Sequence, residues 1–129
     1  MIVGISLTSE VVGDDNQVAA VVEDLLEIVV RQNVAYFEAH PDTPCCLDCG
    51  TVKYREPPFS NRVTFATAED VLRTGHAGCA GAAAYMAAKN RINGIDSKVV
   101  LQRTGTRDFH AIVQRPDGST YDPSLQMPV

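Results

Sequence analysis

The segment from Cys79 to Ile92 restricts the possible folds of this chain more than any other. Its sequence is CAGAAAYMAAKNRI, and half of its residues are alanine or glycine. Alanine is the strongest helix former, so the segment predicts a helix. Because small side chains let neighbours approach on every face, we expect this helix to be packed closely on all sides. Gly75 and Gly78 predict a turn before it, and Asn93-Gly94 predicts its end.

Two more helices are predicted upstream. A long amphipathic helix is expected over residues 18–37, and a short one over 68–73 with Thr67 as its cap and Asp70 near its start. Residues 2–8 predict a short strand, and the stretch from Pro41 to Pro57-Pro58 reads as irregular. The apolar residues that recur at helical spacing in the long helix are Val18, Val21, Val22, Leu25, Ile28 and Val29.

The last third of the chain predicts antiparallel sheet. One strand is expected over residues 98–103 and a second over 108–115, followed by a turn at Pro116-Asp117-Gly118 and a returning strand over 119–122. Helices therefore come first and strands last, which indicates an α+β fold. A chain of 129 residues has the length of one domain, so residues 1–129 are expected to form a single domain.

Composition excludes several classes of function. The 16 acidic residues outnumber the 11 basic ones, which argues against nucleic-acid binding because no basic stripe is present. No apolar stretch is long enough to cross a bilayer, and Met1 to Glu10 lacks the features of a signal peptide. Without an export signal, four cysteines do not indicate a disulfide framework, so a reducing, cytoplasmic location is expected.

Cys79 is placed for nucleophilic chemistry at the predicted helix start. A helix N-terminus favours the thiolate, because its backbone N–H groups and its dipole stabilise negative charge. Gly78 lets a substrate carbonyl approach the backbone, where the Cys79 N–H could donate to an oxyanion. In isolation a small cysteine among alanines is more often a packing residue, so the prediction depends on partners.

His110 and Asp122 are the candidate partners, and hairpin geometry tests whether they can meet. A three-residue loop at 116–118 pairs Arg115 with Ser119, which places His110 and Asp122 on one face as diagonal neighbours. A two-residue loop would put Asp122 on the opposite face. The prediction therefore requires a three-residue turn or a bulge, and Gly118 suits the left-handed position of such a loop. In a triad His110 would be the base and Asp122 would orient it.

Three segments together resemble the transglutaminase-like cysteine protein superfamily. The resemblance rests on the cysteine helix with its closing "R-x-x-G-I", on the histidine strand, and on a terminal "D-G…D-P" element. These residues are Gly78, Cys79, Ala83, Ala87, Arg91, Gly94, Ile95, Phe109, His110, Ala111, and the run from Asp117 to Ser124. The resemblance implies a papain- or transglutaminase-like core and acyl transfer or amide hydrolysis on a peptide or protein substrate, without a cofactor. The family also needs a second oxyanion donor, for which Tyr54 and His76 are candidates.

A narrower likeness links the chain to small members encoded in tailed-phage genomes. It rests on Val52-x-Tyr54, the helix from Glu69 to Gly75, and the closing His110 to Ser124 region. It implies a phage protein acting in the host cytoplasm or on the virion, with phage structural proteins as partners. Such members carry an acidic residue just before the cysteine, where this chain has Gly78. A catalytically idle structural or interaction protein of the virion is therefore the alternative.

A second cysteine cluster, Cys45-Cys46-Leu47-Asp48-Cys49, resembles half of a zinc knuckle. Structural zinc needs four ligands, usually supplied as two such pairs, and only one pair exists. His40, Cys45 or Cys46, Cys49 and His76 could complete a set of ligands, but their spacing does not require one. The expectation is that the chain binds no metal.

Overall fold

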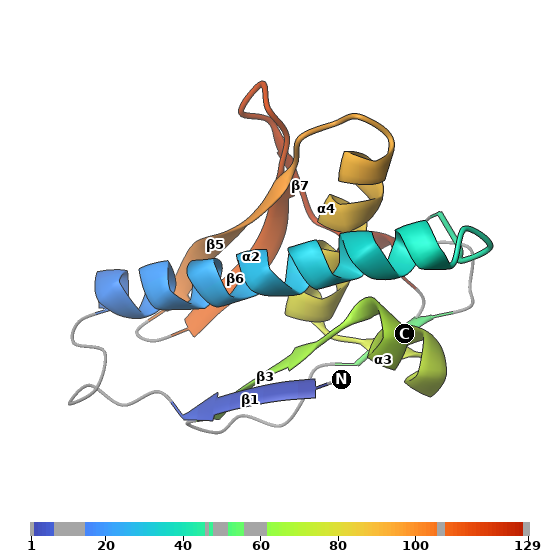
Figure 1. Ribbon diagram of the computed structural model, residues 1–129. Coiled ribbons are helices and arrows are strands. Elements are labelled where there is room, and N and C mark those ends of the chain that lie inside the picture. Colours follow the sequence, from blue (N-terminus) through green and yellow to red (C-terminus); the bar gives the residue numbers. More distant parts are fainter. Residues whose placement is uncertain are drawn as a thin grey trace.

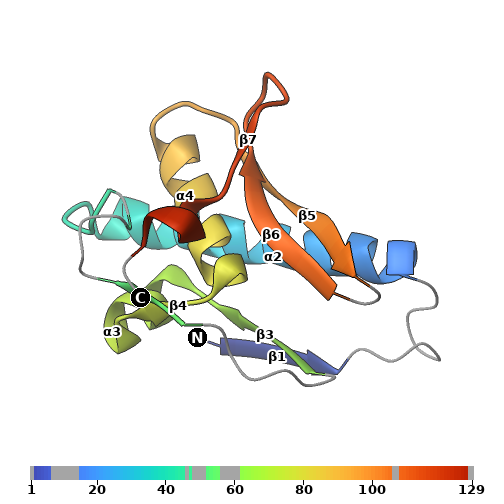
Figure 2. The same cartoon turned by 180° about the vertical axis from the view of Figure 1, so that it is seen from behind.

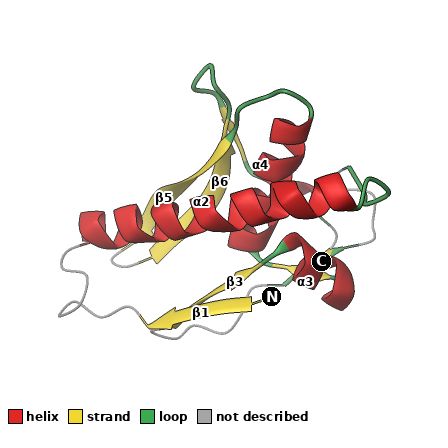
Figure 3. Ribbon diagram, viewed as in Figure 1, coloured by secondary structure: helices red, strands yellow, loops and turns green. Residues whose placement is uncertain are grey.

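A computed structural model describes residues 2–6, 15–45, 47, 52–55, 62–105 and 108–127 (Figures 1 and 3). Helices and strands form a mixed structure in which a three-stranded antiparallel sheet follows the helices, which confirms the predicted α+β class. In chain order the elements are β1 (Ile2–Ser6), α2 (Asp15–Ala39), β2 (Lys53–Tyr54), β3 (Arg62–Ala66), α3 (Ala68–Thr74), β4 (His76–Ala77), α4 (Cys79–Ile92), β5 (Lys98–Gly105), β6 (Asp108–Gln114), β7 (Thr120–Tyr121) and the 3-10 helix η1 (Pro123–Gln126).

α4 is the central element and has the predicted bounds. It packs against α2, β5, β6 and η1, and its small residues are buried on several faces. A side chain added at Gly81 would contact Ala66, Val71 and Ala77 at 3.5–3.6 Å, so β3, α3 and β4 lie close against its first turn. The alanine-rich sequence is therefore explained by close packing on all sides, as expected.

α2 extends beyond the predicted range at both ends and crosses α4 and β5 (Figure 1). The prediction that Ile28 lies on its apolar stripe is wrong, because 52% of Ile28 is exposed. Ile28 is two positions along the chain from the fully buried Leu26, which corresponds to about 200° around a helix and puts Ile28 on the outer face. The buried hydrophobic residues of α2 are Val18, Val22, Leu26, Val29, Val30 and Phe37.

α3 begins as predicted, with Thr67 as its N-cap. The Thr67 side chain accepts from the Asp70 N–H, and the Asp70 carboxylate accepts from the Thr67 N–H, which completes a capping box. Asn33 of α2 adds a bond to this helix start, since its Oδ1 accepts from the Ala68 N–H at 2.7 Å. Gly75 ends the helix in the left-handed conformation, with φ at 76°.

Two strand pairings were not predicted. β3 pairs antiparallel with β1, with Val3 opposite Phe65, and β2 pairs parallel with β4, with Tyr54 opposite Ala77. β2 and β4 are two residues long, too short for periodicity to reveal. β1 and β3 are far apart in sequence, so only the tertiary fold brings them together.

The β5–β6–β7 sheet holds the C-terminal strands in sequence order. β5 and β6 are antiparallel neighbours, with Gln102 opposite His110, and β7 pairs with the end of β6. Within the described ranges, none of the helices has the length and apolar character needed to cross a membrane.

Candidate active site

The β6–β7 hairpin has the register that the triad hypothesis required. Val113 lies opposite Tyr121 and Gln114 opposite Thr120, so the connection holds three residues, 116–118. The Arg115 N–H donates to the Ser119 carbonyl at 2.8 Å, which closes the loop. Gly118 has φ at 89°, the left-handed conformation expected for this position. The parity prediction is confirmed.

The same hairpin brings His110 and Asp122 together. His110 Nε2–H donates to Asp122 Oδ2 at 2.5 Å, and both side chains are partly buried, with 28% and 14% exposed. The second oxygen of Asp122, Oδ1, accepts from the backbone N–H of Ser124 at 2.9 Å and from its hydroxyl at 2.6 Å. Asp122 is thus fixed at both oxygens, one of them by the first turn of η1.

The pKa of Asp122 lies below its ordinary value. Burial alone would raise this pKa, but the hydrogen bonds from Ser124 and His110 stabilise the carboxylate more strongly. A carboxylate accepts and cannot donate, so Nε2 of His110 must carry the proton of that bond. The proton-accepting nitrogen of the neutral ring is then Nδ1.

Cys79 is the first residue of α4, with Gly78 as the N-cap. The thiol is partly exposed, packs at the edge of the hydrophobic core and forms no disulfide. Gly78 is extended and supplies no side-chain capping bond. α4 packs against β6, the strand of His110, and against η1, which follows Asp122 (Figure 2).

Tyr54 and His76 lie on the short parallel pair just before Cys79. The Arg55 N–H donates to the Ala77 carbonyl at 3.0 Å, which fixes Tyr54 beside the chain that leads to Cys79. Tyr54 is partly buried against the core. His76 Nδ1–H donates to the Thr74 carbonyl at 3.0 Å, so its Nε2 can donate only when the ring is protonated. Tyr54 is therefore the better candidate for an oxyanion donor.

The C-terminal end of α4 is held by polar side chains that the sequence did not identify as a group. Asn90 Nδ2 donates to the Tyr121 hydroxyl at 3.0 Å, which ties the cysteine helix to the residue before Asp122. Arg91 donates from both terminal nitrogens to Glu27 of α2, at 2.8 and 2.6 Å. The carboxylate raises the pKa of Arg91, and the hydrogen bond from Arg91 lowers the pKa of Glu27. These contacts fix the C-terminal end of α4 against β7 on one side and α2 on the other.

Lys89 is buried at the same end of the helix. Its Nζ donates to the hydroxyl of Thr43 at 2.7 Å and lies 3.9 Å from the centre of the Phe37 ring. Burial lowers the pKa of Lys89 below its ordinary value. The contact anchors the chain that leaves α2 onto α4.

The candidate zinc ligands are only partly described. Cys46 and Cys49 lie outside the described residues. His40 is exposed, its Nδ1–H donates to the Tyr36 carbonyl at 2.9 Å, and its ring stacks on Tyr36. Among the residues that the structure describes, no three His, Cys, Asp or Glu side chains gather as metal ligands would.

Comparison with protein families matches residues 48–121 to the transglutaminase-like superfamily. This segment covers more than half of the chain. The chain belongs to the transglutaminase-like superfamily. The matched segment contains Tyr54, Cys79 and His110, and it ends one residue before Asp122. No curated protein and no solved structure matches the chain.

Proposed function

We propose that this member of the transglutaminase-like superfamily is a cysteine enzyme of amide hydrolysis or acyl transfer. Cys79 is the nucleophile, His110 the general base and Asp122 the residue that orients the base. The observation that carries the proposal is the His110–Asp122 hydrogen bond, made on a hairpin that packs against the helix beginning at Cys79. The family match supports the same chemistry, because it covers Cys79 and His110.

The proposed reaction has two halves. Nδ1 of His110 takes the thiol proton, and the thiolate attacks the carbonyl carbon of the amide to form a C–S bond. The imidazolium returns the proton to the departing nitrogen as the C–N bond breaks, which leaves a thioester on Cys79. Water then attacks the thioester while His110 accepts its proton, and the acid is released as the thiol is restored. An amine in place of water would give transfer.

The negative oxygen formed in each half needs two donors. The Cys79 backbone N–H at the start of α4 is the first proposed donor, and the hydroxyl of Tyr54 is the second. The pairing of Tyr54 with Ala77, two residues before the nucleophile, supports this assignment. Gly78 supports it too, since a glycine at the N-cap leaves the approach to the helix start without a side chain.

Thiol alkylation tests the proposal directly. We expect iodoacetamide to label Cys79 at pH 7 about tenfold or more faster than cysteine in a short peptide, because a paired histidine enriches the thiolate. His110→Ala should abolish this advantage, and Asp122→Asn should reduce it. The site of labelling is read by mass spectrometry of the digested protein, and Cys79→Ala gives the background from Cys45, Cys46 and Cys49.

Equal labelling of wild type and His110→Ala, at the rate of a peptide cysteine, would contradict the enzyme proposal. It would favour the alternative, a transglutaminase-like protein that keeps the fold as an idle structural or interaction component. Far-UV circular dichroism of each variant checks that it is folded.

The substrate class proposed is a peptide or protein amide. The likeness of the Val52 to Tyr54 and Glu69 to Gly75 segments to phage-encoded members supports a phage origin, with the host cytoplasm or the virion as its place and phage structural proteins as partners. Mass spectrometry of purified virions and of the infected-cell lysate tests this placement. Absence of the chain from both would overturn it.

A further inference from the structure

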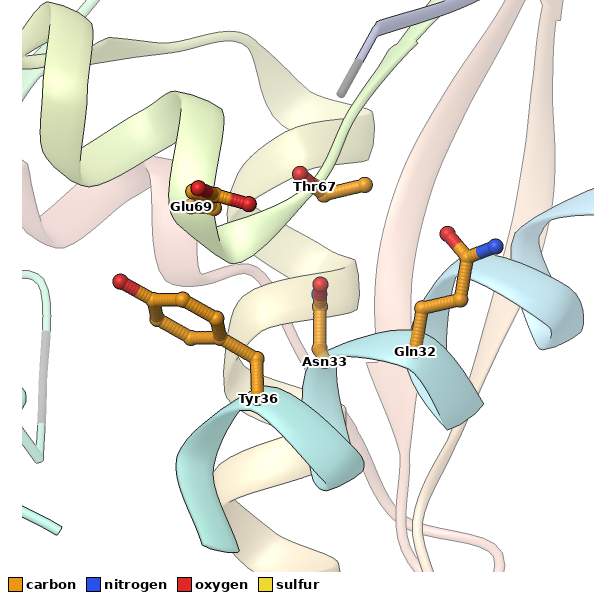
Figure 4. A pocket seen from close by; sticks show the side chains of 5 residues that line it. All are labelled: Gln32, Asn33, Tyr36, Thr67 and Glu69. Carbon is orange, nitrogen blue, oxygen red and sulfur yellow. The ribbon is translucent and has the colours of Figure 1, made fainter. Parts of the chain in front are cut away.

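The hollow shown in Figure 4 is lined by parts of the chain that carry none of the three proposed triad residues. It holds about 210 Å³ between α2 and the start of α3, and its lining residues are Gln32, Asn33, Tyr36, Thr67 and Glu69. The bonds described for the triad come instead from the β6–β7 hairpin and from η1, where one serine contacts the proposed acid.

The C-terminal segment contains the sequence Asp-x-Ser twice, and both copies make the same local bonds. In the first copy, Asp117 Oδ1 accepts from the Ser119 backbone N–H at 2.9 Å and from its hydroxyl at 2.7 Å. In the second, Asp122 Oδ1 accepts from the Ser124 backbone N–H at 2.9 Å and from its hydroxyl at 2.6 Å. Short polar side chains commonly bond to groups two residues along the chain, so this local geometry alone does not indicate a function.

The surroundings of the two aspartates differ. Asp117 is exposed in the hairpin turn, and both of its described side-chain bonds come from Ser119. Asp122 is partly buried, with 14% of its side chain exposed, and its Oδ2 accepts from His110 Nε2–H. The motif therefore links a serine hydroxyl to a histidine only at Asp122.

Ser124 is held in place by the hydrophobic core. Pro123 and Met127 are buried on either side of it, and the Met127 N–H donates to the Ser124 carbonyl at 3.4 Å. The short helix η1, which contains Ser124, packs against α4. The Ser124 hydroxyl thus has a rigid support, whereas Ser119 lies in an exposed turn.

Bonds at both oxygens fix the plane of the Asp122 carboxylate. With Oδ1 held by Ser124, the group cannot turn about its Cβ–Cγ bond without losing two hydrogen bonds, so Oδ2 stays directed at His110 Nε2. This keeps the ring proton on Nε2 and leaves Nδ1 as the acceptor. In a partly buried site water replaces a lost hydrogen bond poorly, so removal of the hydroxyl costs more there than at the exposed Asp117.

We propose that Ser124 is a positioning residue, whose hydroxyl holds the Asp122 carboxylate in the orientation that aligns His110. The local Asp-x-Ser motif supplies the bond, and the packing of η1 together with the contact to His110 gives the bond this use. For its effect on the Cys79 thiol the role rests on the proposed function, whereas its effect on the His110 ring does not depend on thiol chemistry.

Solution ¹⁵N NMR of the histidine rings tests the role in the full-length Cys79→Ala protein, at about pH 8.5 where histidine is ordinarily neutral. We expect Nε2 of His110 to carry the proton, which gives widely separated shifts for the two ring nitrogens. Ser124→Ala should draw these shifts together, because a less restrained carboxylate lets the Nδ1–H tautomer form. Ser124→Thr keeps the hydroxyl and should restore the separation. The spectrum of His110→Gln assigns the signals.

Ser119→Ala is the matched control, because it deletes the same bond from the exposed copy of the motif. It should leave the His110 ring shifts unchanged. In the protein with Cys79 intact, Ser124→Ala should slow alkylation by iodoacetamide about fivefold, while Ser124→Thr and Ser119→Ala keep the wild-type rate. Far-UV circular dichroism checks that each variant is folded.

Unchanged ring shifts in folded Ser124→Ala would overturn the positioning role and leave Ser124 as part of the η1 cap alone. Equal changes in Ser124→Ala and Ser119→Ala would overturn it too, since they would report a general loosening of the hairpin. Altered ring shifts in Ser124→Ala, in a protein whose Cys79 labelling does not respond to His110→Ala, would support the positioning role and contradict the proposed enzyme.

Discussion

The starts of α3 and α4 are neighbours along the chain and in space, yet their N-termini are capped differently. At α3 the side chains of Thr67, Asp70 and Asn33 all bond to the first turn. At α4 the N-cap is Gly78, which offers no side chain, and the first helical residue is Cys79. Val71 of α3 lies 3.6 Å from where a side chain at Gly81 of α4 would begin, so the first turns of the two helices lie against each other.

The two helix starts use the same backbone feature in different ways. A helix start leaves backbone N–H groups without intrahelical partners and carries partial positive charge. At α3 protein side chains satisfy these groups, which contributes to stability. At α4 the N-cap Gly78 supplies no side-chain bond, and the polar side-chain bonds described for this helix lie at its far end, where Asn90 and Arg91 bond to Tyr121 and Glu27. In our proposal the α4 start serves a thiolate and an oxyanion.

Giving α4 a cap should have the largest effect on reactivity. In Gly78→Asp the carboxylate can accept from the first-turn N–H groups, and its charge disfavours a thiolate at Cys79. We expect alkylation of Cys79 at pH 7 to slow by about tenfold, which corresponds to one pKa unit or roughly 1.4 kcal/mol. The backbone at Gly78, with φ −86° and ψ −171°, is open to any residue.

The same substitution should slightly increase stability, by a few tenths of a kcal/mol, as expected when aspartate replaces an N-cap glycine. Gly78→Asn is the matched control, since it caps without charge and should slow alkylation less. If Gly78→Asp reacts as fast as wild type, the absence of a cap does not serve the thiol.

Removing the cap of α3 should act on stability alone. Thr67→Ala deletes the hydroxyl that accepts from the Asp70 N–H, and we expect a loss of about 1 kcal/mol in the free energy of unfolding. Urea titration followed by circular dichroism measures it, with the exposed Thr120→Ala as control. A tenfold change in Cys79 alkylation in the folded Thr67→Ala protein would show that the two helix starts are not independent.

The acid dependence of the α3 start should give the smallest effect. Burial alone would raise the pKa of Asp70, but hydrogen bonds, including those from Arg73 and Thr67, lower it below its ordinary value. Because the folded pKa lies below the unfolded one, the stabilisation is complete well above pH ~4 and is lost as pH falls through the folded pKa.

Asp70→Asn should therefore cost on the order of 0.5 kcal/mol at pH 7, since Arg73 is largely exposed and its ion pair is screened. Urea midpoints at pH 7 and pH 3 measure the difference between the two proteins. The difference should shrink toward pH 3; a constant difference would mean that the Asp70 charge does not contribute.

Local sequence determined much of the fold because the signals were local. The alanine run and its flanking glycines fixed the bounds of α4, and Thr67 with Asp70 fixed the start of α3. The three-residue turn ending in Gly118 fixed the register of the β6–β7 hairpin, and with it the meeting of His110 and Asp122. Each of these depends on residues a few positions apart.

Tertiary structure alone decided what distant residues do. The exposed position of Ile28 follows from which face of α2 meets α4, and periodicity could not choose between the faces. The pairing of Tyr54 beside β4 and the bonds of Asn90 and Arg91 join parts of the chain far apart in sequence. From the sequence, Asn33 is only a polar residue that lies at helical spacing between Val29 and Phe37, which are both buried. Its bond from the Ala68 N–H exists only because α3 packs against α2, since a hydrogen bond depends on positions in space that sequence spacing does not specify.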